Sequence, residues 1–176
     1  MTPEFSRPHR IDQIGAGETR VEIEATPEEC AAIARRFDLV GVERLRAAFV
    51  LRRAALGFHA TGHLSAAVTQ SCGVTGDPLP ATIEEDFTIR FLPEMAEEES
   101  HDEVELGEED MDAVFYSGSA LDLGEAAAET LALSLDPFPR SPGAAAALRE
   151  AGVISEDEAA PLSPLAAALK GKLGKG

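Results

Sequence analysis

The 176-residue sequence contains no tryptophan, only two cysteines, and no lysine before position 170. Cys30 and Cys72 are too few for a disulfide framework, which excludes the class of small disulfide-rich secreted domains. No apolar run approaches the ~20 residues that a membrane helix needs, and the first residues lack the apolar stretch of a signal peptide. We therefore expect a cytoplasmic protein with reduced thiols and no membrane contact.

Positive charge is also scarce. The formal net charge is −17, and such a surface repels phosphate, so it is unfavourable for broad contact with nucleic acid and suits a basic partner. Ten of the fifteen basic residues, all arginines, lie at or before Arg90, and none lies between 91 and 139. Eleven acids fall between Glu94 and Asp112. We expect 94–112 to be a flexible acidic loop and 152–176 an extended C-terminal tail.

The hydrophobic content of 44% is sufficient for the core of one domain over residues 1–176. Alternation of apolar and polar residues predicts strands. Single strands are predicted over 19–23, 82–92 and 113–116. A long hairpin is predicted over 44–70, with its bend near Gly57.

Helical spacing and capping residues predict two main helices. The first covers about 27–37, with Thr26 as N-cap and Glu29 completing a capping box. The second covers 122–135, with Asp122 as N-cap and Glu125 in the same capping arrangement, and residues 143–152 predict a short third helix. The fold class is therefore α+β, with helices packed on an antiparallel sheet that is either open or partly closed into a barrel.

The candidate reactive residues are Cys72, His59 and His63. On a strand the two histidines are separated by roughly 13 Å, too far to share a zinc ion through bonds of about 2 Å. No positive group near Cys72 in the sequence is expected to lower its pKa, so we interpret it as an inert thiol buried at a strand end. Two alternatives to a non-enzymatic protein remain, a cysteine-dependent enzyme and a metal-binding protein that use these residues.

Carboxylates offer no clearer enzymatic site. Glu84 and Asp86 share one strand face and Glu85 the other, so we expect a solvated surface rather than a catalytic pair. The acidic run lacks the glycine-centred ligand spacing of a calcium-binding loop, and no phosphate-binding glycine motif is present. The sequence therefore predicts no cofactor, no metal site and no catalysis.

Two motifs separated by the acidic run resemble the YceD family. They are CGVTGDPLPATIEEDFTIRFLP and ALDLGEAAAETLALSLDPFPRSPG. Within them, the residues that match the family's two motifs are Cys72, Val74, Thr75 and Pro78, and then Asp122, Leu123, Gly124 and Glu125. Gly76 stands where that family usually has leucine, and Asp77 keeps the charge of its usual glutamate.

The resemblance implies a role in the synthesis, processing or stability of 23S ribosomal RNA, without catalytic residues. Two partners are compatible with it, a basic protein of the large ribosomal subunit and the RNA itself. For the first, the acidic loop would act as an RNA-like polyanion through Glu97, Glu98, Glu99, Glu108, Glu109 and Asp110. For the second, Arg44, Arg46 and Arg52 would form a compact positive patch on one strand face, although a merely solvated face is equally compatible with them.

Overall fold

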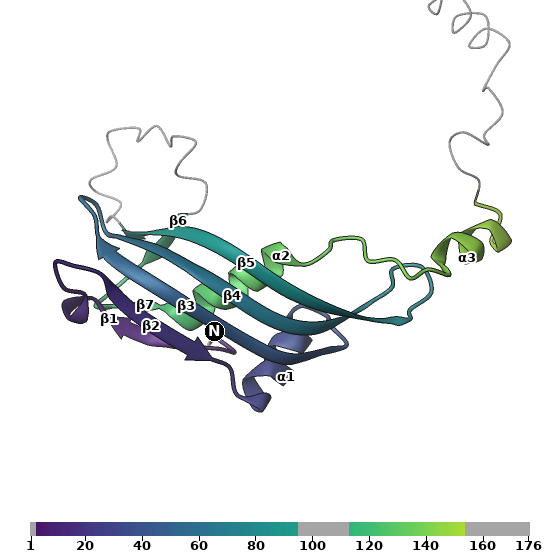
Figure 1. Ribbon diagram of the computed structural model, residues 1–176, viewed down its shortest axis with the longest axis horizontal. Coiled ribbons are helices and arrows are strands. Elements are labelled where there is room, and N and C mark those ends of the chain that lie inside the picture. The colour runs from purple at the N-terminus through teal and green to yellow at the C-terminus, as the bar shows by residue number, and fades with distance from the viewer. Residues whose placement is uncertain (1–2, 95–112, 154–176) are drawn as a thin grey trace, which may run out of the picture.

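The computed structural model describes residues 3–94 and 113–153, whose main feature is a long twisted sheet with a helix lying along one face (Figure 1). The elements in chain order are β1 (Pro8–Arg10), a 3-10 turn (Ile11–Gln13), β2 (Thr19–Glu24), α1 (Pro27–Arg36), β3 (Gly41–Arg53), β4 (Phe58–Ser71), β5 (Pro78–Pro93), β6 (Ala113–Tyr116), β7 (Ala120–Asp122), α2 (Leu123–Ser134) and α3 (Ala144–Glu150). The predicted α+β class is therefore confirmed.

The main sheet is open, in the order β2-β3-β4-β5-β6, and β1 pairs separately with β7. The partly closed barrel that the sequence also allowed is not formed, because the outermost strands β2 and β6 are short and do not pair with each other. The sheet is also mixed: β2 to β5 are antiparallel, whereas β6 runs parallel to β5. A parallel neighbour needs a long crossover connection, and the chain between Pro93 and Ala113 supplies one.

The long hairpin of β3 and β4 follows from strict alternation. Leu45, Ala47, Phe49 and Leu51 are all buried, while the residues between them face outward or lie at the margin of the core. Gly57 forms the bend with a φ of +78°, and a Cβ there would overlap the carbonyl oxygen of Phe91. The predicted hairpin and its bend are confirmed.

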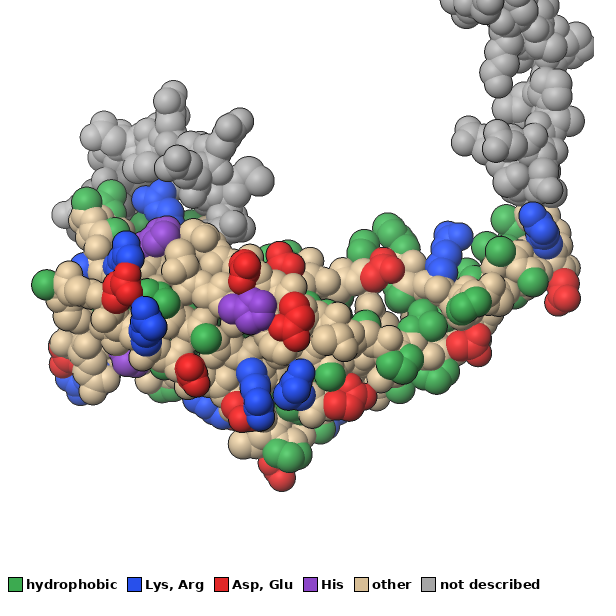
Figure 2. All heavy atoms as spheres, in the orientation of Figure 1, with side chains coloured by type: hydrophobic (Ala, Val, Ile, Leu, Met, Phe, Trp, Pro, Cys, Tyr) green, Lys and Arg blue, Asp and Glu red, His purple; other side chains and the backbone are tan. Residues whose placement is uncertain are grey.

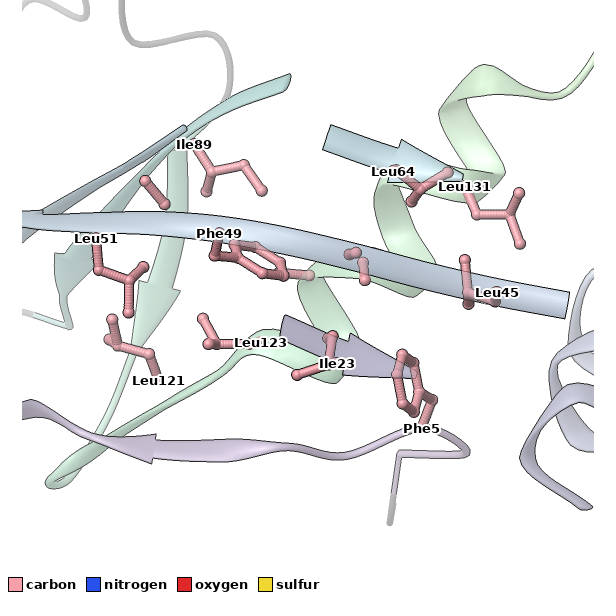
Figure 3. Packing of buried hydrophobic residues seen from close by; sticks show 14 of the residues in the cluster. Phe5, Ile23, Leu45, Phe49, Leu51, Leu64, Ile89, Leu121, Leu123 and Leu131 are labelled. Carbon is pink, nitrogen blue, oxygen red and sulfur yellow. The ribbon is translucent and has the colours of Figure 1, made fainter. Parts of the chain in front are cut away.

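The core lies between the sheet and the α2 layer. Leu121, Leu123 and Leu131 face Leu45, Phe49 and Leu51 of β3, and Phe5 closes one end (Figure 3). α1 contacts β3 at the end of the sheet (Figure 1), and its capping box between Thr26 and Glu29 is formed as predicted.

Two predicted segments lie outside the described residues. They are the acidic loop, of which only Glu94 is described, and the C-terminal tail beyond Val153. Among the described residues, no helix is both long and apolar enough to cross a membrane.

Gly62 allows two aromatic rings to meet across β4. It lies between Phe49 of β3 and Phe87 of β5 in register, and those rings pack edge to face with centroids 5.0 Å apart. A Cβ at this position would overlap the Phe87 ring and the Ala48 carbonyl oxygen. This close approach explains why a glycine occupies the middle of the longest antiparallel ladder.

We therefore expect Gly62→Ala to lower the free energy of unfolding by about 1–3 kcal/mol, because the new methyl group must displace the aromatic pair. Urea denaturation provides the measurement. Gly17→Ala is the matched control, since a Cβ there meets no atom within 4 Å and should change stability by less than about 0.5 kcal/mol. Equal stability of the two variants would contradict this account of Gly62.

Candidate functional site

Asp122 joins the N-terminal segment to the first turn of α2. Its Oδ1 accepts hydrogen bonds from the backbone N–H groups of Gly124 and Glu125, at 3.1 and 3.2 Å. The same oxygen accepts the Arg7 backbone N–H at 2.8 Å, and Oδ2 accepts the Ser6 hydroxyl at 2.5 Å. One carboxylate therefore caps the helix and also fixes a segment about 115 residues earlier in the chain.

Leu123 and Gly124 explain the rest of this contact. Leu123 is fully buried in the core, and a Cβ on Gly124 would approach the Phe5 carbonyl oxygen to 2.5 Å. The glycine is therefore required for the N-terminal segment to lie directly against α2.

Glu125 was predicted to reach back to the N-cap backbone, and that prediction was wrong. Its carboxylate instead forms a two-point ion pair with Arg36 of α1, at 2.7 and 2.9 Å. Arg36 also contacts Glu4 at 3.1 Å, and these carboxylates raise the pKa of its guanidinium, Glu125 most strongly. The Asp122–Glu125 motif is thus a junction between the N-terminal segment, α1 and α2.

Cys72 begins the turn between β4 and β5 and is only 3% exposed. Its backbone closes the turn, because Cys72 N–H donates to the Asp77 carbonyl and Gly76 N–H donates to the Cys72 carbonyl, at 2.8 and 2.9 Å. Gly76 has a φ of +76°, which a leucine would rarely adopt. The predicted burial at a strand end is confirmed, and the glycine at this position suits the turn.

The Cys72 sulfur accepts three backbone N–H groups, which the sequence analysis missed. They belong to Ser141 at 3.2 Å, Thr75 at 3.4 Å and Val74 at 3.5 Å. The pKa of the thiol is lowered to about 6, most strongly by hydrogen bonding with the Thr75 side chain and then by the backbone and side chain of Ser141. The expectation of an unperturbed thiol was wrong because neutral hydrogen-bond donors of Thr75 and Ser141, rather than a cationic side chain, stabilise the thiolate.

The turn also holds the segment that follows α2. Gly73 N–H donates to the Pro139 carbonyl at 2.9 Å, and the Thr75 hydroxyl lies 3.1 Å from the buried Ser141 hydroxyl. The Asp77 carboxylate accepts the Thr75 hydroxyl at 2.6 Å. Val74 is half-buried, and Pro78 begins β5. The first motif therefore fixes the chain leading to α3, so both motifs make structural contacts between segments far apart in the sequence.

His59 and His63 both lie on β4 and point to the open face, as expected for strand residues of equal parity. His63 lies between two carboxylates, with Nδ1 2.7 Å from Asp86 Oδ1 and Nε2 2.9 Å from Glu84 Oε2. Asp86 most strongly, and then Glu84, raises the pKa of His63. Within 3–94 and 113–153, no group of three potential ligands has a geometry that could hold a metal ion.

Arg44, Arg46 and Arg52 lie together on the open face of β3, but acids lie beside them. Arg46 pairs with Glu24 at 2.8 Å, Arg52 pairs with Glu18, and Arg44 donates to the Ser65 hydroxyl at 3.3 Å. Figure 2 shows basic and acidic side chains interspersed on this face. The face is therefore mixed in charge rather than a compact positive patch.

The described residues carry nineteen acids and twelve arginines, a net charge of −7. Residues 95–112 carry ten acids and no lysine or arginine, a further −10. Residues 154–176 carry three charges of each sign, so they add nothing to the total of −17. The candidate partner-binding acids Glu97, Glu98, Glu99, Glu108, Glu109 and Asp110 all lie outside the described residues.

A family model described as large ribosomal RNA subunit accumulation protein YceD matches residues 60–171, which is more than half of the chain. The match includes both motifs, the acidic run between them and the Pro139–Ser141 segment. No curated protein and no solved structure matches the sequence.

Replacing Asp122 tests the junction. We expect Asp122→Ala to lower the free energy of unfolding by about 2–3 kcal/mol, because it removes a helix cap and leaves the Arg7 N–H without its acceptor. Asp122→Asn keeps the acceptor oxygen and should lose about half as much. Urea denaturation measures both, with the exposed Asp12→Ala as control, and equal losses in all three variants would refute the role of this carboxylate.

The Cys72 thiolate makes stability depend on pH. The folded pKa of about 6 lies below the usual value of about 8.5 for an unfolded thiol. Such a depressed pKa stabilises the fold fully above pH ~8.5, and this contribution is lost as the pH falls through ~6. The difference in unfolding free energy between the wild type and Cys72→Ala should therefore increase from pH 6 to pH 8.5. A difference that is constant across this range would show that the sulfur is not ionised.

Proposed function

This chain belongs to the YceD family of large ribosomal RNA subunit accumulation proteins, and from that membership we propose that it acts without catalysis by binding a basic protein of the large ribosomal subunit. While it is bound to this chain, a basic subunit protein does not contact RNA nonspecifically before it is incorporated. Because 23S ribosomal RNA then receives its proteins without delay, more of that RNA accumulates. The role in RNA accumulation would then be indirect.

The distribution of charge is the observation that carries this proposal. The described body is net negative, and the largest block of charge, ten acids without a counter-charge, lies between β5 and β6 in the sequence. A polyanion next to a negative body attracts lysine-rich and arginine-rich proteins and repels phosphate. The acids Glu97, Glu98, Glu99, Glu108, Glu109 and Asp110 are the residues that we assign to this contact.

Direct RNA binding by β3 has less support. Sequence-independent RNA affinity requires arginines that neutralise phosphates, but Arg46 and Arg52 already pair with Glu24 and Glu18. A phosphate would have to displace these carboxylates and then lie beside Glu22 and Asp86 on the same face. The charges near the arginine row therefore oppose a second anion.

A cysteine-dependent enzyme is also disfavoured. The Cys72 sulfur has thiolate character, but it is buried and directed at three backbone N–H groups of its own fold. His59 and His63 lie on the open face of β4 and form no hydrogen bond with the sulfur, whereas Cys72 directly follows β4 and is buried. The sulfur therefore has neither a general base nor access to a substrate.

The test is a pull-down from nuclease-treated large-subunit extract with the full chain as bait. We expect small basic subunit proteins to be retained at about 0.1 M salt and released near 1 M, because screening shortens the range of charge attraction. Neutralising the six assigned acids to Gln or Asn should weaken the binding of the retained proteins at least about tenfold.

A variant that combines Arg46→Glu with Arg52→Glu tests the alternative, direct RNA binding by β3. Under this proposal it leaves protein binding intact or strengthens it, because it adds negative charge. If instead nuclease removes all captured material and the arginine variant abolishes capture, RNA is the partner and the proposal is wrong.

A further inference from the structure

One edge of the main sheet has no neighbouring strand over most of its length. β5 pairs with β4 from Pro78 to Phe91, whereas on its other side β6 pairs only with Arg90–Pro93. Among the described residues, Leu79–Ile89 therefore has no strand partner on that side. Apart from Pro80, which has no N–H, this edge presents a row of backbone N–H and C=O groups about 36 Å long, which can pair with an added strand.

A groove runs beside this edge. It has a volume of about 520 Å³ and lies between β5 and α2, with Phe87, Ile89, Val114 and Leu133 among the apolar residues that line it. Leu133 is 85% exposed, which is unusual for a leucine on a helix that otherwise faces the core. Alternate side chains of a strand added to β5 would point into this groove and cover these residues.

The charges around the groove are negative. Glu85 and Glu129 line it, and neither carboxylate forms a hydrogen bond or ion pair with another described residue. Burial, and then the nearby Glu125, raises the pKa of Glu129, so a cation placed there would relieve an unfavourable charge. On the opposite face of the same strand, Glu84 and Asp86 both contact the His63 imidazole, and Glu84 also accepts the Ser65 hydroxyl.

We propose that a basic, extended segment of the partner protein pairs with Leu79–Ile89 as an added strand. Its groove-facing side chains alternate between apolar residues, which cover the apolar lining, and lysine or arginine, which lie against Glu85 and Glu129. This inference rests on the proposed function and specifies how the partner binds. Ala113 lies beside Arg90 in the sheet, so the ten-acid run that precedes it in the sequence is joined to the chain next to this edge.

Charge argues against the other occupants. A second copy pairing through the same edge would bring Glu84, Glu85 and Asp86 near their own equivalents, and like charges on adjacent strands destabilise a sheet. The acidic run of this chain has the same sign as the groove. The C-terminal lysines Lys170, Lys172 and Lys175 do have the right charge, so they enter the test as a separate arm.

The probe is a ten-residue peptide, added to the full chain, in which every second residue is in turn valine or lysine and the residues between them are threonine. We expect binding by fluorescence anisotropy, with amide hydrogen exchange slowed within 79–89. The matched peptide, with alternate backbone nitrogens methylated, keeps every side chain and charge but loses the donors on one side. It should bind at least about tenfold more weakly, because several backbone hydrogen bonds are lost. Equal binding, or protection elsewhere only, would overturn the inference.

Protein variants test the groove. Glu85→Gln combined with Glu129→Gln should weaken the lysine–valine peptide roughly tenfold, since two carboxylate contacts are lost. Glu28→Gln, an exposed acid on α1 away from the groove, is the control and should not change the affinity. Lys170→Gln, Lys172→Gln and Lys175→Gln together should leave exchange at 79–89 unchanged without peptide. Faster exchange there would assign the edge to this chain's own tail and overturn the proposal.

The two proposals fail in different ways. If a basic subunit protein binds the full chain but leaves 79–89 unprotected, strand addition is wrong and the proposed function stands. If no basic subunit protein binds at all, the proposed function fails, whatever the peptide does.

Discussion

The interaction on which the rest of the structure depends is the contact of Asp122 with the N-terminal segment and the first turn of α2. Its two oxygens receive four hydrogen bonds, two from the first turn of α2 and two from Ser6 and Arg7. This contact places Phe5 against the core, and Arg7 continues it to Glu29, which caps α1. The helical layer is therefore held as one unit, and the sheet folds over it.

How much of the fold and of the site could be predicted depended on how far apart in the sequence the interacting residues lie. Alternation predicted β3 and β4, and Thr26 and Asp122 predicted the helix starts, because those signals are local in sequence. The Ser141 N–H at Cys72 lies 69 residues away, and no local pattern reveals it. The same is true of Arg36 with Glu125. Both motifs were found in the sequence, but their roles required the tertiary contacts.

The electrostatic pattern of the folded body differs from its sequence pattern. Arginines appear as a row on β3 when that strand is read alone, but β2 and β5 place carboxylates in adjacent registers on either side of the hairpin. Pairing across strands therefore largely neutralises the row within the sheet. The largest block of unpaired negative charge lies in the connection between β5 and β6. The residues that build the sheet and the residues that carry most of the net charge are therefore different segments of the sequence.

The parallel pairing of β6 has a further consequence for how this protein can vary. Arg90–Pro93 and Ala113–Tyr116 are fixed side by side, and Glu94 N–H donates to the Tyr116 carbonyl at 2.9 Å, so the connection is anchored at both ends by the sheet. Lengthening such a closed connection twofold costs only about 0.6 kcal/mol in closure entropy. Insertions and deletions between these anchors should therefore cost little folding free energy, so the length and charge of the connection can change without altering the sheet.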